Sequence, residues 1–198
     1  MPRQVLQFKI TLVDSNPIIW RQIQISDLCT FWSLHVAIQD AMGWEDYHLH
    51  EFEVVNPATG VKERIGIPND EFAGELATLP GWDLKVMPYL SMNQKIKYTY
   101  DFGDDWEHEI EFEGAFSKSP AKKYPTCLDG ERACPPEDVG GIGGFYEYVK
   151  AIKDKTHPQH RQYLDWRGKF NPNKFNTKNI KFHSASSRLK QLQSQIGE

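Results

Sequence analysis

The sequence of 198 residues predicts an α+β fold, a single domain in which a mostly antiparallel sheet of hairpins packs against helices. Stretches in which apolar and polar residues alternate, as in half-buried strands, recur through the first 115 residues. Other segments space their apolar residues as helices do. No internal repeat and no linker divides the chain. With 39% hydrophobic and 25% charged residues, the composition excludes collagen-like, disordered and disulfide-scaffold classes.

Two alternating stretches predict a hairpin at the start of the chain. Residues 4–13 place four apolar side chains on one face, and residues 18–25 follow after the turn sequence Asp-Ser-Asn-Pro. Arg21 shares the apolar phase of the second stretch. Its aliphatic stem is therefore expected to pack in the core while its guanidinium reaches a carboxylate.

A helix and a second pair of strands are predicted next. Thr30 is a suitable N-cap for a helix that runs to about Met42, and Gly43 is suited to end it. A strand over residues 47–55 stops at the turn sequence Asn-Pro-Ala-Thr-Gly, and residues 61–67 are expected to pair back with it. Residues 68–91 are expected to form loops and short helical pieces.

The clearest hairpin signal spans residues 94–115, where two alternating stretches flank the sequence Gly-Asp-Asp. A three-residue loop brings apolar residues opposite each other on one face and opposite charges together on the other. The predicted pairs are Phe102 with Trp106, Tyr100 with His108, Tyr98 with Ile110, Ile96 with Phe112, Lys97 with Glu111 and Lys95 with Glu113. A run of alternating glutamates would form the solvated face.

The last third of the chain predicts loops and helices. A Pro- and Cys-containing loop leads through Gly-Gly-Ile-Gly-Gly to a helix over residues 145–153, and Pro158 suits the first turn of another. The glycines lack the endings of phosphate-binding loops, so a tight, close-packed turn is expected there. Residues 1–177 are assigned to the α+β domain, and residues 178–198 to a basic C-terminal tail that is partly helical.

The net charge of −4 hides an uneven distribution. From residue 167 onward there are seven basic residues and one acidic residue, whereas the first 166 residues carry 16 basic and 26 acidic residues. A basic tail is able to bind nucleic acid through phosphate contacts, although the acidic body opposes such binding. A solvated tail is the alternative.

The sequence also predicts the cellular setting. No stretch approaches the ~18 apolar residues of a membrane span, so no membrane partner is expected. The N-terminal residues lack the pattern of a signal peptide, and three cysteines do not make a paired framework. The expected location is the cytoplasm, with reduced thiols.

His48 and His50 are the first candidates for chemistry. On the predicted strand, positions i and i+2 face the same way, and two neutral imidazoles so placed are able to bind zinc or iron. The alternative is a pair of partly buried histidines bonded to neighbouring groups.

The predicted hairpin loop is crowded with ionisable residues. They are Asp101, Asp104, Asp105, Glu107 and His108. Asp101 would face Glu107 across the strands, where like charges repel unless a cation, an arginine or a raised pKa offsets the repulsion. The alternative places Asp104 and Asp105 in ordinary turn hydrogen bonds and pairs Asp101 with Arg21 or Arg132.

The third candidate segment is the loop that carries Cys127, Cys134, Glu137 and Asp138. The two cysteines are close enough in sequence to share a metal ion or to form a disulfide, and a histidine from another segment would complete a Cys/His site. Their spacing matches no standard zinc motif. Two small buried side chains are the alternative.

Four ordered motifs resemble one known family. They are Ile-Trp-Arg-Gln-Ile from Ile19, Gly-Trp at Gly43 with His-Leu-His-Glu-Phe from His48, Tyr-Asp-Phe-Gly-Asp-Asp-Trp-Glu-His from Tyr100, and Cys-Pro-Pro-Glu-Asp-Val-Gly-Gly from Cys134. Together they resemble the Ri-plasmid open-reading-frame-three family, also called the plasmid ORF-like family. The resemblance implies an α+β domain of bacteria and archaea, often encoded near mobile genetic elements. It supplies no catalytic residues, and the resolvase label of some members finds no serine cluster here.

Three functions follow as hypotheses. The first is a non-catalytic binding or interaction domain with a protein or small-molecule partner, acting as an accessory of mobile genetic elements. The second is a metal-dependent hydrolase, with a metal ion as its only cofactor, held by His48, His50, His108, Asp101 and Asp104. The third is DNA association through the tail. A site, where one exists, is expected where three segments meet: its candidates are His48, His50, Asp101, Asp104, Asp105, Glu107, His108, Cys127, Cys134, Glu137 and Asp138.

Overall fold

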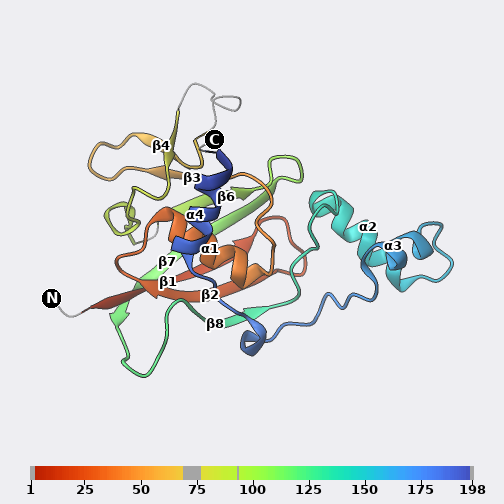
Figure 1. Ribbon diagram of the computed structural model, residues 1–198. Helices are drawn as coiled ribbons and strands as arrows, with labels where there is room; N and C mark the ends of the chain where they lie inside the picture. The colour runs from red at the N-terminus through yellow and green to blue at the C-terminus, as the bar shows by residue number, and fades with distance from the viewer. Residues whose placement is uncertain (1–2, 69–76, 93, 197–198) are drawn as a thin grey trace.

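Eight strands form one sheet in the computed structural model, which describes residues 3–68, 77–92 and 94–196 (Figure 1). They are β1 (Gln4–Leu12), β2 (Trp20–Ser26), β3 (His50–Val55), β4 (Lys62–Gly66), β5 (Thr78–Pro80), β6 (Lys95–Tyr100), β7 (Trp106–Ser117) and β8 (Thr126–Glu131). Their order across the sheet is β5-β4-β3-β6-β7-β1-β2-β8. Neighbours pair antiparallel except β4 and β5, which are parallel. The single-domain α+β fold predicted from the sequence is confirmed.

The predicted first helix is also confirmed. The helices are α1 (Phe31–Met42), α2 (Gly141–Lys153), α3 (His160–Arg167) and α4 (Ala185–Ile196). At the start of α1, the Thr30 hydroxyl accepts a hydrogen bond from the backbone N–H of Ser33. At its end, Gly43 adopts a φ of 95° and its N–H donates to the Gln39 carbonyl.

The core lies between one face of the sheet and α1. Phe8 of β1 stands between Ile23 of β2 and Phe112 of β7, and Ile10 similarly faces Ile110. These side chains pack with α1 in one continuous cluster of buried residues. The opposite face carries charged residues in ion pairs, such as Lys95 with Glu109 at 2.6 Å. This division follows from the two-residue period of a strand.

The hairpin predicted over residues 94–115 forms as β6 and β7, but its predicted register is wrong by two residues. Tyr100 pairs with Trp106, and Tyr98 with His108, so the loop holds five residues rather than three. Lys97 accordingly faces Glu109, and the residue opposite Glu107 is Thr99 rather than Asp101. A shift of two residues keeps every side chain on its original face, so both registers satisfy the sequence pattern. Asp101, with a φ of 57°, leaves the strand and begins the loop.

The third strand begins at His50 rather than at residue 47, so His48 lies in a loop. The expectation that His48 and His50 project from one strand face is therefore wrong. The backbone N–H of Tyr47 donates to the side-chain hydroxyl of Tyr100, and the pairing of β3 with β6 begins only at His50. Two short strands, β5 and β8, were not predicted, and part of the expected loop region (residues 69–76) lies outside the described residues.

The glycine-rich segment begins α2 instead of preceding it. The helix starts at Gly141, four residues before the predicted start, and Gly140 with a φ of 89° precedes it. A Cβ atom at Gly144 would lie 2.0 Å from the Val139 carbonyl oxygen, and one at Gly141 would lie 2.5 Å from the Asp104 carbonyl oxygen. The prediction of a close-packed turn thus holds, with its glycines in the first helical turn.

The C-terminal segment crosses α1 and ends in α4, which lies over α1 (Figure 1). The indole N–H of Trp32 donates to the Ala185 carbonyl at 2.7 Å. The α2 and α3 helices pack on each other beyond one end of the sheet (Figure 1). No helix within the described residues has both the length and the apolar run that crossing a bilayer requires.

Candidate functional site

Three segments that are distant in sequence meet at one end of the sheet. They contribute His48 from the loop before β3, Asp101 from the β6–β7 loop and Asp138 from the loop before α2. His48 Nε2 lies 3.1 Å from Asp138 Oδ1 and 3.6 Å from Asp101 Oδ2. One potential ligand atom from each of the three residues lies within 4.8 Å of the others. We call these residues the His48 triad.

The loop that carries His48 is fixed at three consecutive residues. The Glu45 N–H donates to Glu137 Oε1 at 2.7 Å, and the Tyr47 N–H donates to the Tyr100 hydroxyl at 3.0 Å. Between them, Asp46 Oδ1 lies 2.7 Å from His35 Nε2 of α1. These bonds place the His48 ring at the surface of the sheet end, where it is partly exposed.

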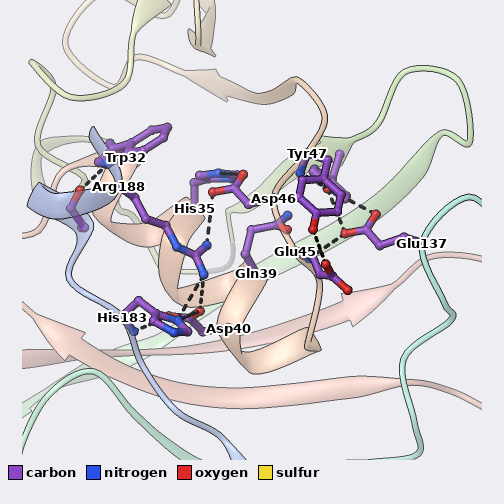
Figure 2. A network of polar contacts seen from close by, with 12 residues as sticks. Trp32, His35, Gln39, Asp40, Glu45, Asp46, Tyr47, Glu137, His183 and Arg188 are labelled. Atoms are coloured by element: carbon purple, nitrogen blue, oxygen red, sulfur yellow. Dashed lines mark hydrogen bonds and ion pairs between the residues drawn. The ribbon is translucent and has the colours of Figure 1, made fainter. Parts of the chain in front are cut away.

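A network of charged and polar groups supports this loop from α1 and α4. Figure 2 shows Arg188 of α4 reaching Asp46 at 3.2 Å and Asp40 at 2.7 Å, with His183 also bonded to Asp40. His35 continues the network into the core, because its Nδ1 lies 2.8 Å from the Tyr98 hydroxyl. Although burial acts against it, the charges and hydrogen bonds of its partners lower the pKa of Asp46.

The two aspartates of the triad both have left-handed backbone conformations. Asp101 and Asp138 each have a φ of 57°, a region in which non-glycine residues are uncommon and in which aspartate is enriched. Asp101 Oδ1 accepts a bond from the Gly103 N–H at 2.9 Å, which leaves Oδ2 toward His48. Asp104 Oδ2 accepts a bond from the Gly140 N–H at 3.0 Å. This second bond ties the hairpin loop to the loop that carries Asp138.

Glu137 lies behind the triad and is buried. Its carboxylate accepts hydrogen bonds from the Tyr100 hydroxyl at 3.1 and 3.3 Å, as well as the bond from Glu45. Burial raises the pKa of Glu137, and the nearby Asp138 acts in the same direction. A carboxyl group with a raised pKa beside a cluster of potential ligands is a common feature of functional sites.

The triad offers one imidazole nitrogen and two carboxylates, a donor set suited to Zn²⁺, Mn²⁺ or Fe²⁺. Ligands ~2.1 Å from a common ion lie at most ~4.2 Å from each other. The separations of His48 from both aspartates meet that requirement. Three donors do not complete the coordination of these ions, and the His48 and Asp138 side chains are accessible, so further positions would remain open to water or a ligand.

Several predicted site residues lie elsewhere. His50 and His108 are fully enclosed by the core on the covered face of the sheet, so the predicted ring of three histidines around one ion is wrong. Glu107 is paired with Lys97 on the opposite face, and Asp105 is exposed in the loop. The predicted pairing of Asp101 with an arginine is also wrong, because the nearest nitrogen of a basic side chain to its carboxylate among the ion-pair contacts is His48 Nε2, 3.6 Å from Oδ2.

Cys127 and Cys134 form no disulfide and do not join the triad. Both lie close enough to the Arg21 guanidinium for its charge to act on their thiols. Arg21 itself contradicts the prediction of a carboxylate partner, since its four hydrogen bonds all go to backbone carbonyls. The supporting network of Asp46 and Arg188 had no signal in the sequence, because its members lie 142 positions apart.

One basic residue of the C-terminal tail forms ion pairs within the fold. Arg188 directs its guanidinium into the network of Asp40 and Asp46 rather than toward solvent. The lysines of the tail are exposed. Association of the tail with nucleic acid stays a prediction.

Comparisons with known proteins find relatives of undetermined function. An uncharacterized protein y4hQ of Sinorhizobium fredii (strain NBRC 101917 / NGR234) is 34% identical over 174 residues, which cover 85% of this chain and 83% of the relative. The crystal structure of a protein of unknown function, MM3350 from Methanosarcina mazei Go1, superposes with a TM-score of 0.84 at 38% identity. That match covers 92% of this chain and 100% of the other. Residues 4–179 match the family of plasmid pRiA4b ORF-3-like proteins, and the chain therefore belongs to that family.

Proposed function

We propose that this protein is a binding domain that holds a divalent cation at the His48 triad. The observation that carries the proposal is the convergence of three ligand atoms, from three separate segments, within 4.8 Å of one another. The hydrogen bonds of the His48 loop and the bond between Asp104 and Gly140 hold these segments in place before any ion arrives. Preorganisation of this kind reduces the cost of binding.

Calorimetric titration of tag-free protein with ZnCl₂ and with MnCl₂ tests the proposal. One equivalent of at least one ion should bind, and Asp101→Asn should weaken that binding at least ten-fold. Binding should also weaken in acidic solution, because a ligating imidazole must be neutral. The matched control is Asp105→Asn: Asp105 lies in the same loop, is exposed and has a similar φ of 54°, but lies outside the triad.

Two results would reject the cation site. One is the absence of stoichiometric binding by either ion. The other is an equal loss of affinity in the Asp101→Asn and Asp105→Asn variants, which would indicate diffuse attraction by the acidic loop. Asparagine tolerates left-handed backbone, so Asp101→Asn tests the ligand with little effect on the loop conformation.

Glu137 favours metal-assisted hydrolysis as a second candidate function. Its burial and its raised pKa suit a carboxylate that accepts a proton from an attacking water molecule. Glu137→Gln should then leave cation affinity within about two-fold while abolishing cation-dependent hydrolysis of bis(p-nitrophenyl) phosphate or p-nitrophenyl acetate. Hydrolysis that persists in this variant, or that never depends on the cation, would contradict the enzymatic role and leave the binding role standing.

A further inference from the structure

A cavity lies between the sheet and the C-terminal segment, and none of the three triad residues lines it. It has a volume of about 380 Å³, within the range of small-molecule sites. Its lining includes Arg21 of β2, Trp44 after α1, Cys134, Phe175, and two lysines of the C-terminal segment, Lys174 and Lys181. We call it the Arg21 cavity.

Arg21 is a buried cation without a carboxylate partner among the described residues. Arg21 is only 2% exposed to solvent. Nε donates to the Ala41 carbonyl, and the two terminal nitrogens donate to the carbonyls of Trp20, Glu131 and Arg132, all at 2.8–2.9 Å. These four bonds use four of the five guanidinium hydrogens. Carbonyl dipoles satisfy the donors but do not neutralise the charge, and burial of an unneutralised charge is costly.

Further cations surround the same cavity. Arg167, Lys174 and Lys181 line it, and none of them forms an ion pair with a carboxylate in the part of the chain that the structure describes. Arg167 donates instead to the backbone carbonyl of Glu137. Four positive groups therefore line one cavity, and none of them forms an ion pair within the described part of the chain.

Three carboxylates also line the cavity, and only one of them is paired with a cation among the described residues. Asp40 is paired with Arg188, which does not line the cavity. Glu45 and Glu137 accept hydrogen bonds from the hydroxyls of Tyr47 and Tyr100, which leave their charges in place. Four cations against these two carboxylates leave an excess of positive charge, so the cavity favours anions over cations.

The walls add an aromatic surface beside the charges. The Phe175 ring stacks on the Arg21 guanidinium, with its centroid 4.0 Å from Cζ. Trp44 also lines the cavity, and because its indole N–H is used by the Pro135 carbonyl, it contributes apolar rather than polar surface. From these charges and surfaces we propose that the Arg21 cavity binds a small organic phosphate, with the phosphate among the cations and the organic part against the aromatic rings.

The probes are adenosine 5′-monophosphate, ribose 5-phosphate and inorganic phosphate, titrated calorimetrically with a chelator present so that the cation site stays out of the measurement. Adenosine and acetate are the uncharged and singly charged comparisons. At least one organic phosphate should bind with a Kd below about 1 mM and more tightly than adenosine or acetate. Absence of any phosphate binding up to that concentration would overturn the proposal, whatever the outcome at the triad.

A pair of double variants separates the cavity from general basicity. Lys174→Gln/Lys181→Gln removes two exposed cations that line the cavity, so folding should be unaffected, and affinity should fall at least ten-fold. Lys178→Gln/Lys190→Gln removes two exposed lysines of the same segment that do not line it, and affinity should change less than two-fold. Equal losses in the two double variants would show nonspecific attraction and overturn the site.

Discussion

The imidazole rings of His35 and His50 lie face to face, with centroids 3.4 Å apart and planes inclined by 7°. His35 is bonded through both nitrogens, to Tyr98 and Asp46, whereas neither nitrogen of His50 has a partner among the described residues. Burial, with a smaller effect of His35, holds the pKa of His50 well below its usual range. Burial likewise lowers the pKa of His108 to about 4. Both His50 and His108 are therefore neutral in the folded protein near neutral pH.

Because the pKa values of His50 and His108 are lowered, we predict that the folded protein loses stability in mild acid. A lowered pKa in the folded state means that protonation favours the unfolded chain, in which a histidine pKa is ~6.5. The contribution of each neutral histidine to the free energy of unfolding is fully present above pH ~6.5 and is lost as the pH falls toward the folded-state pKa. For His108 the loss should reach about 3 kcal/mol near pH 4. Urea unfolding between pH 8 and pH 4 measures it. His108→Leu should have a shallower pH dependence, and an unchanged slope would contradict the assignment to His108.

Arg188 is predicted to stabilise the fold through Asp40. The Asp40 side chain is only 2% exposed and accepts from Arg188 at 2.7 Å. Arg188→Leu leaves that carboxylate with its exposed partner His183 alone, so the free energy of unfolding should fall by about 2 kcal/mol. In the control, Arg161→Leu, an exposed pair with Asp165 is lost, at a cost below about 0.5 kcal/mol. Similar losses in the two variants would show that the Arg188–Asp40 contact stabilises the fold no more than an exposed ion pair does.

The start of α2 provides a matched pair of glycine substitutions. Gly144→Ala should destabilise the protein by about 3 kcal/mol, because the new Cβ would lie 2.0 Å from the Val139 carbonyl oxygen and the backbone must move. A Cβ atom at Gly143 would instead point into open space, so Gly143→Ala should stabilise the helix by about 0.5 kcal/mol. Thermal unfolding of both variants measures the difference. Equal effects would contradict the close contact at Gly144.

The register of the β6–β7 hairpin is testable by cross-linking. Lys97 lies directly opposite Glu109, whereas the register expected from the sequence pattern would place it opposite Glu111. Lys97→Cys/Glu109→Cys should oxidise readily to a disulfide, because cross-strand neighbours bring Cβ atoms within ~4.5–5.5 Å. Lys97→Cys/Glu111→Cys should oxidise far more slowly. Non-reducing mass spectrometry after peptide cleavage distinguishes the two, and the reverse preference would reject the observed register.

The α1 helix and the β6–β7 hairpin show which features follow from nearby residues and which depend on the tertiary structure. Thr30 and Gly43 set the ends of α1 through bonds to residues at most four positions away, so the sequence alone predicts them. The hairpin was also predictable from alternation, but its register was not. A two-residue shift preserves both faces, and the left-handed turn at Asp101 selects one register.

Sequence patterns were sufficient to predict the α+β class, the first hairpin and the caps of α1. The site was expected in three segments, and the fold brings one residue of each, His48, Asp101 and Asp138, close together. Which residues of those segments meet depends on the packing of the whole chain. In the folded protein His50 and His108 lie in the core. His48 lies at the surface, because β3 starts three residues later than predicted and leaves His48 outside the strand. Packing also brings Asp138 to His48 across 90 positions. Local patterns depend on neighbours within a few residues, whereas such encounters require every layer of the fold to be in place.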